Sequence, residues 1–247
     1  MNIVWHDFIP WATGHASIST YGARIDFLFD LITYIVGFWF ILAEGVLFYF
    51  VLRYLRKDGV KAQYITGEKH NELMWLEVPH ILIILCDVVL IAGTMMVWYA
   101  VKQDLPTPDA TVKVIAQQWA WTFVQPGPDG IIDTADDITT IDELHIKANT
   151  TYHYKLSAKD VLHSFSIPVF RLKQDAIPGR EISGWFKATE TGVHDIQCAE
   201  ICGFGHGLMP ARLFIESDED HKKWMAEKTG IPMSSMVAAI PAAASKN

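Results

Sequence analysis

Two long apolar runs near the N-terminus constrain this chain most, because each is long enough to cross a lipid bilayer as a helix. Residues 31–52 carry a single charge, Glu44, and residues 78–101 carry a single charge, Asp87. A helix needs about 20 apolar residues to cross a hydrocarbon core of about 30 Å. A buried hairpin in a soluble protein is the alternative, but two such runs in tandem are rare outside membranes. The sequence therefore predicts a two-helix membrane hairpin over residues 27–102.

The charges around these runs predict their orientation. The intervening loop, residues 53–76, holds the basic residues Arg53, Arg56, Lys57, Lys61 and Lys69. The outer ends of the runs are flanked by Arg24 and Lys102 alone. Because cytoplasmic loops carry an excess of Lys and Arg, we expect this loop in the cytoplasm and both termini outside. Residues 1–26 would form an outer segment, and the chain after Val101 would face the periplasm of a bacterium or the intermembrane space of a mitochondrion.

The pattern changes after the second run to short segments rich in Val, Ile, Thr and aromatic residues. Turn pairs such as Pro126-Gly127 and Pro178-Gly179 separate them. The predicted strands are residues 112–124, 143–148, 152–157, 161–170, 182–188, 193–197 and 211–216. Several short strands in succession are typical of an antiparallel sandwich or barrel. We expect this β domain over residues 103–220, followed by a tail over residues 221–247 that is loosely ordered after Trp224.

The β domain is acidic. Between Gln103 and Asp220 there are 18 Asp and Glu against 9 Lys and Arg. This balance favours a basic protein over nucleic acid as a partner, although an acidic surface kept for solubility is the alternative. The polar run 126–142 is expected to be a surface loop. Calcium binding by this run is an alternative, but the run lacks the ordered pattern of an EF-hand.

One segment between two predicted strands carries soft metal ligands. It reads Cys198-Ala-Glu-Ile-Cys202-Gly-Phe-Gly-His206-Gly-Leu-Met209-Pro210. Thiolate, imidazole and thioether together select copper over magnesium or calcium. Cys202, His206 and Met209 with one distant histidine would suffice for a single electron-transfer copper. Cys198 adds a second thiolate, so two sulfurs can bridge two metal ions that each take one imidazole.

His163, in the predicted strand 161–170, is the candidate for the distant imidazole. Two other uses of the cysteines remain open. Structural zinc is one, although Met is not a usual zinc ligand. A disulfide in an oxidising compartment is the other, and it would leave His163, His206 and Met209 without a reason to cluster.

From the helical hairpin to about Ser217, these motifs resemble subunit II of the haem-copper cytochrome c oxidases. The resemblance implies a cupredoxin-like Greek-key β domain with two copper ions in a dinuclear copper A centre. The implied copper ligands are the bridging thiolates of Cys198 and Cys202, the imidazoles of His163 and His206, the weak ligand Met209 and the backbone carbonyl of Glu200. The side chain of Glu200 would also bind a magnesium ion shared with subunit I.

Two further motifs agree with the family. Gln118-Trp119-Ala120-Trp121 resembles its aromatic motif, which implies that Trp119 is the electron entry point under the cytochrome c docking surface. Ala120 stands where an aromatic residue is usual. Glu72-Leu-Met-Trp-Leu-Glu-Val-Pro79 resembles the start of the family's second helix, which implies that Glu72 lies at the mouth of a proton pathway in subunit I.

The resemblance implies the electron-entry subunit of a respiratory terminal oxidase that takes electrons from cytochrome c. Haem and oxygen reduction would belong to subunit I, and no Cys-x-x-Cys-His is present to attach a c-type haem. The copper subunit of a related nitric oxide reductase and a membrane-tethered copper-binding module are the alternatives. Glu44 and Asp87 are expected to be neutralised or paired against the partner subunit.

Overall fold

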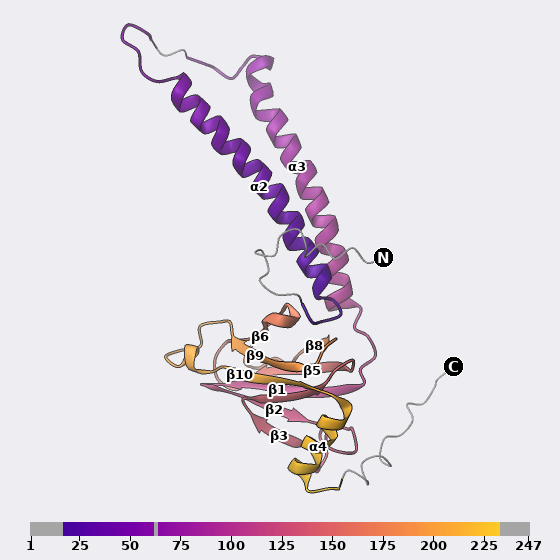
Figure 1. Cartoon of the computed structure of the whole chain (residues 1–247). Helices are drawn as coiled ribbons and strands as arrows, with labels where there is room; N and C mark the ends of the chain where they lie inside the picture. The colour runs from indigo at the N-terminus through magenta and orange to yellow at the C-terminus, as the bar shows by residue number, and fades with distance from the viewer. Residues whose placement is uncertain (1–16, 62–63, 233–247) are drawn as a thin grey trace, which may run out of the picture. The chain divides into compact units, whose positions relative to one another are not determined.

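The computed structural model describes residues 17–61 and 64–232 (Figure 1). The chain divides into two compact units: Arg24–Tyr99 forms one, and the described residues on either side of it form the other. The helical unit contains α2, Gly22–Arg53, and α3, His70–Trp98, which the short π-helix η2, Tyr99–Gln103, continues.

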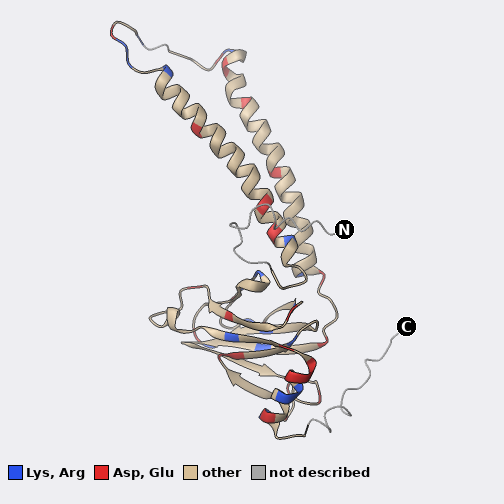
Figure 2. Cartoon of the chain, viewed as in Figure 1, with Lys and Arg blue, Asp and Glu red and all other residues tan. Residues whose placement is uncertain are grey.

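Both long helices contain an 18-residue stretch apolar enough to cross a membrane. The mean hydropathy of this stretch is 2.2 within Gly22–Arg53 and 2.5 within His70–Gln103. Every residue of α3 is at least partly exposed, and so are the large apolar side chains of α2 from Phe27 onward. Lys and Arg lie at the ends of the helices (Figure 2). Apolar surface of this extent is stable in lipid and not in water. The predicted hairpin is confirmed as two membrane-capable helices.

The β unit is a sandwich of two five-stranded sheets. Its strands are β1 Ala110–Gln117, β2 Ala120–Gln125, β3 Ile138–Ile141, β4 Glu143–Lys147, β5 Thr151–Ala158, β6 His163–Ile167, β7 Leu172–Ala176, β8 Ile182–Lys187, β9 Gly192–Cys198 and β10 Ala211–Glu216. One sheet has the order β3-β2-β1-β5-β8 and the other β4-β10-β9-β6-β7. The predicted cupredoxin-like sandwich is confirmed, but β1–β5 and β10–β4 pair in parallel.

The core lies between the two sheets, because successive side chains of a strand alternate between its faces. In β1, Val112 and Val114 are buried while their neighbours are partly exposed. Trp121 and Phe123 of β2 follow the same alternation, and Phe165 of β6 contacts both rings from the opposite sheet. Phe165 pairs with Cys198 of β9, so this aromatic cluster lies at the end of the sandwich that carries the cysteines.

Two predicted strands were wrong in detail, and two strands were missed. The run 112–124 is a hairpin that turns at Gln118 and Trp119, and the run 161–170 begins as a strand only at His163 and ends in the 3-10 helix η3, Pro168–Phe170. Strand β3 lies in the predicted loop 126–142, and β7 was not predicted. The hairpin was missed because neither Gln118 nor Trp119 is a typical turn residue. Strand β7 was missed because it has few β-formers, and its pairing with β6 decides its conformation.

The two ends of the β unit also differ from the expected boundaries. Residues 18–21, in the predicted outer segment, join the sandwich: Ile18 N–H donates to Val169 O at 3.0 Å, and Ser19 bridges to Ala188. The predicted boundary at residue 220 falls inside helix α4, Asp218–Thr229. Ser217 caps that helix by accepting from Asp220 N–H at 3.1 Å. Residues 233–247 lie outside the described part.

Candidate metal centre

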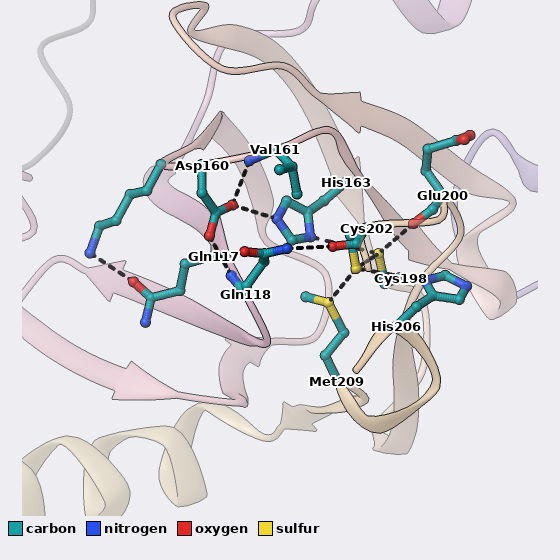
Figure 3. A network of polar contacts seen from close by, with 11 residues as sticks. Gln117, Gln118, Asp160, Val161, His163, Cys198, Glu200, Cys202, His206 and Met209 are labelled. Carbon is teal, nitrogen blue, oxygen red and sulfur yellow. Dashed lines mark hydrogen bonds and ion pairs between the residues drawn. The ribbon is translucent and has the colours of Figure 1, made fainter. Parts of the chain in front are cut away.

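Two thiols lie side by side where β9 ends. Cys198 is the last residue of β9, Cys202 is in the following loop, and their sulfur atoms are 3.8 Å apart (Figure 3). Both are free thiols. The separation is far longer than a disulfide bond of about 2.0 Å, so the disulfide alternative does not describe this fold.

Each sulfur faces one imidazole. His163, the first residue of β6, is completely buried, and its Nδ1 lies 3.9 Å from the Cys198 sulfur. His206, in the 3-10 helix η4, His206–Leu208, places its Nδ1 3.8 Å from the Cys202 sulfur. Strand β6 pairs with β9, with Phe165 opposite Cys198. This pairing brings His163, which comes earlier in the chain, to the segment from Cys198 to Met209, called the ligand loop below.

Met209 and Glu200 complete the group of residues that the sequence singled out. Cys202 donates to the sulfur of Met209 at 3.4 Å, and Met209 is buried. The backbone carbonyl of Glu200 accepts from the Cys198 thiol at 3.3 Å. Figure 3 shows the carboxylate of Glu200 pointing away from the sulfur atoms.

Among the described residues, His163, Cys198 and Cys202 form the one group of three His, Cys, Asp or Glu ligand atoms that lie within 4.8 Å of one another. Two thiols, two imidazoles and a thioether are a soft donor set. Their closeness is consistent with copper binding. Zinc fits less well, because the thioether of Met209 is not a ligand that zinc uses.

The surroundings of Cys202 favour the protonated form of its thiol. Burial and the neighbouring Cys198 thiol raise the pKa of Cys202 to about 11. Cys202 therefore keeps its proton at neutral pH without a cation. A soft metal ion binds thiolates, so its binding would release protons.

A carboxylate outside the sulfur cluster orients His163. Asp160 Oδ1 accepts from His163 Nε2–H at 2.9 Å, so the Nδ1 lone pair is left to face the sulfurs. Burial alone would raise the pKa of Asp160, but hydrogen bonds from His163, Gln118 and Val161 lower it below its usual range. No role for Asp160 or Gln118 was predicted from the sequence. The spacing of a carboxylate three residues before a histidine was the available signal.

Trp119 lies in the turn between β1 and β2 and is 40% exposed. Its ring covers the ligand loop: a Cβ added to Gly205 would lie 2.4 Å from the ring atom Cδ2, and one added to Gly203 would lie 3.3 Å from Cζ2. The structure therefore brings Trp119 against the loop that carries Cys202 and His206.

Glu72 belongs to the other unit. It lies in the first turn of α3, where its Oε2 accepts from Gly67 N–H at 2.9 Å. This contact closes the end of the loop before α3. Glu72 therefore has a local structural contact, separate from the thiol cluster of the β unit.

Similar proteins identify the family. A sequence profile described as "Cytochrome C oxidase subunit II, periplasmic domain" matches residues 128–217. A probable cytochrome c oxidase subunit 2 of Rickettsia bellii is 30% identical over 225 residues, covering 83% of this chain and 78% of that protein. An alternative cytochrome c oxidase subunit 2 of Bradyrhizobium diazoefficiens is 29% identical over 249 residues, covering 92% and 87%.

Among solved structures, the periplasmic domain of subunit II of the Bradyrhizobium japonicum cytochrome oxidase is similar, at 28% identity and a TM-score of 0.46. The match covers 51% of this chain and 97% of that one. The sequence relatives extend over both the helical hairpin and the β unit. The chain belongs to the subunit 2 family of the cytochrome c oxidases.

Proposed function

We propose that this membrane-anchored oxidase subunit accepts electrons from cytochrome c at a dinuclear copper centre and passes them to haem in subunit I for oxygen reduction. The observation that carries the proposal is the pair of free thiols, 3.8 Å apart, that each face a different imidazole. A single copper would use one thiolate and leave the other without a role. Two coppers would be held by both thiolates, and each ion could take one histidine.

The chain's own residues supply stiffness. A copper pair held here would take up and release one electron at a time. Cys198 and His163 lie on paired strands, and Trp121 donates its ring N–H to Met209 O at 3.1 Å beneath the loop. Ligands held by a packed sheet move little when the charge of the site changes, which favours fast electron transfer.

Electron entry is proposed at Trp119, because its exposed ring lies on the ligand loop. The surrounding domain has twice as many acidic as basic residues between Gln103 and Asp220, 18 against 9. A negative surface attracts and orients a positively charged cytochrome c. The donor would therefore dock over Trp119 through charge complementarity.

The remaining assignments follow from the proposed placement in the membrane. Residues 27–102 would anchor the subunit in lipid against subunit I, with the basic loop 53–76 in the cytoplasm and residues 103–220 on the periplasmic or intermembrane side. The Glu200 carboxylate, directed away from the sulfurs, would take magnesium together with subunit I. Glu72 would admit protons from the cytoplasmic side.

The test is copper content and electron paramagnetic resonance on the purified oxidase. We expect two coppers per chain in this subunit and a hyperfine pattern from one electron shared equally by both nuclei. Cys198→Ser should abolish the shared pattern because one bridge is lost. One copper per chain, or an unchanged pattern in the variant, would contradict the proposal.

A further inference from the structure

Gln118 contacts both halves of the candidate metal centre from the turn between β1 and β2. Its side-chain Nε2 donates to Cys202 O at 2.8 Å, and its backbone N–H donates to Asp160 Oδ2 at 2.6 Å (Figure 3). Its neighbour Gln117 differs: its Oε1 accepts from Lys159 Nζ at 3.0 Å, at the exposed surface. The two adjacent glutamines therefore have different partners.

The first contact holds the thiol-bearing loop. Cys202 is 3% exposed, and the next residue, Gly203, has a φ of +121°, where glycine is favoured. A Cβ added to Gly203 would lie 2.9 Å from Gln118 Nε2. The loop thus makes its sharp bend directly against the Gln118 amide, and the amide N–H fixes the orientation of the Cys202 carbonyl at that bend.

The second contact holds the imidazole side. The two oxygens of Asp160 divide their partners: Oδ1 accepts from His163 Nε2–H, and Oδ2 accepts from Gln118 N–H. The carboxylate cannot rotate without breaking one of these hydrogen bonds. Gln118 therefore links Asp160, which orients His163, to the backbone carbonyl of Cys202.

We propose that Gln118 is a positioning residue of the metal centre, whose side-chain amide sets the Cys202 loop against the strand that carries His163. This inference rests on the proposed function, because it concerns the geometry of the same copper pair. Equal sharing of an electron requires two matched ligand sets. A shift of the Cys202 side relative to the His163 side makes the two copper positions unequal.

The test is Gln118→Met in the purified oxidase. Methionine has nearly the same length as glutamine but no side-chain N–H donor. The backbone hydrogen bond to Asp160 is retained, so only the hydrogen bond to the Cys202 carbonyl is removed. We expect copper to load, the hyperfine pattern to show unequal sharing, and copper to be lost to a chelator about 10-fold faster. Electron paramagnetic resonance and a time course of copper release measure these effects.

Gln117→Met is the matched control, because it makes the same change one residue away on a side chain that contacts Lys159. It should keep the wild-type pattern and rate of copper loss. A wild-type pattern in Gln118→Met, or equal changes in both variants, would overturn the positioning role. A wild-type oxidase without a shared electron would instead refute the proposed function. If Gln118→Met fails to fold, Gln118→Ala is judged by the same spectroscopic outcomes.

Discussion

At the scale of single residues, the ligand loop depends on two glycines, Gly203 and Gly205, for different reasons. Gly203 adopts a backbone conformation that other residues rarely take, whereas Gly205 has a φ of −88° that any residue can adopt. Gly205 is therefore required for space alone, because the ring of Trp119 occupies the position of its missing Cβ. The same contact joins the proposed electron entry point to the loop between Cys202 and His206.

This predicts that Gly205→Ala displaces the Trp119 ring. The added methyl would lie 2.4 Å from ring atom Cδ2, so the indole must move, at a cost of about 1–3 kcal/mol. Oxidation of cytochrome c should slow several-fold while both coppers stay bound, as measured by steady-state turnover and metal analysis. Gly207→Ala is the control, since its Cβ would meet no atom within 4 Å. Equal turnover in the two variants would remove this contact from the electron path.

At the scale of elements, helix α4 is attached to the sandwich through one carboxylate between two histidines. Glu216 of β10 accepts from His145 Nδ1 of β4 at 2.8 Å and from His221 Nδ1 of α4 at 2.9 Å. The His145 ring also stacks on Trp224 of α4, with ring centroids 4.3 Å apart. No role for His145 was predicted from the sequence, and His221 was expected in the C-terminal tail. In the structure, both are buried side chains that hold three elements together.

The charge of Glu216 predicts an acid-dependent stability. Burial alone would raise the pKa of Glu216, but the hydrogen bonds and charges of His145 and His221 lower it from 4.5 to about 2. Because the folded-state value is depressed, this stabilisation is fully present above pH 4.5 and is lost as the pH falls toward 2. We expect the free energy of unfolding of the detergent-solubilised subunit, followed by tryptophan fluorescence, to fall across this range.

Glu216→Gln should remove the acid-dependent stabilisation that the Glu216 carboxylate provides. The free energy of unfolding of the variant should be lower by about 1–3 kcal/mol at neutral pH, because one buried imidazole N–H loses its charged acceptor. It should also change less with pH between 4.5 and 2. Glu219→Gln is the control, because Glu219 binds Lys223 on the exposed side of α4. If the two variants respond alike to acid, the histidine pair does not hold α4 through this charge.

At the scale of the whole molecule, the chain combines a unit suited to lipid with an acidic unit suited to water. The apolar helices carry Lys and Arg at their ends, and the β unit carries the excess of Asp and Glu. The docking proposed above depends on the summed charge of that unit more than on any one pair. Attraction between charged surfaces separated by water weakens as salt shortens its range to about 8–10 Å at physiological ionic strength.

Oxidation of cytochrome c should therefore be sensitive to salt. Raising the ionic strength from about 0.01 to 0.15 M should increase the KM for cytochrome c by about 10-fold, because the screening length falls from about 30 to about 8 Å. Steady-state kinetics over a salt series measures this. Turnover with a small uncharged reductant should stay constant in the same series. A KM for cytochrome c that does not change with salt would contradict electrostatic docking.

Some features were predictable because they depend on local composition or spacing. The two membrane helices follow from uninterrupted apolar length, and the sandwich follows from repeated short runs of β-formers. The run from Cys198 to Met209 puts two sulfurs, an imidazole and a thioether within one loop, so their closeness was expected from spacing alone. The position of His163 was an inference from ligand chemistry, 35 residues away from Cys198.

Other features were decided by contacts between distant segments. The sequence by itself determined which parts enter lipid and which donors the ligand loop carries, because these depend on residue type along the chain. Tertiary structure decided the pairing of β6 with β9 that brings His163 to the sulfurs, the bridge from Gln118 to Cys202, and the position of Glu216 between two histidines. Hydrogen bonds of this kind need two surfaces to meet at about 3 Å, and that distance is set by the packing of the two sheets and α4, which no local pattern encodes.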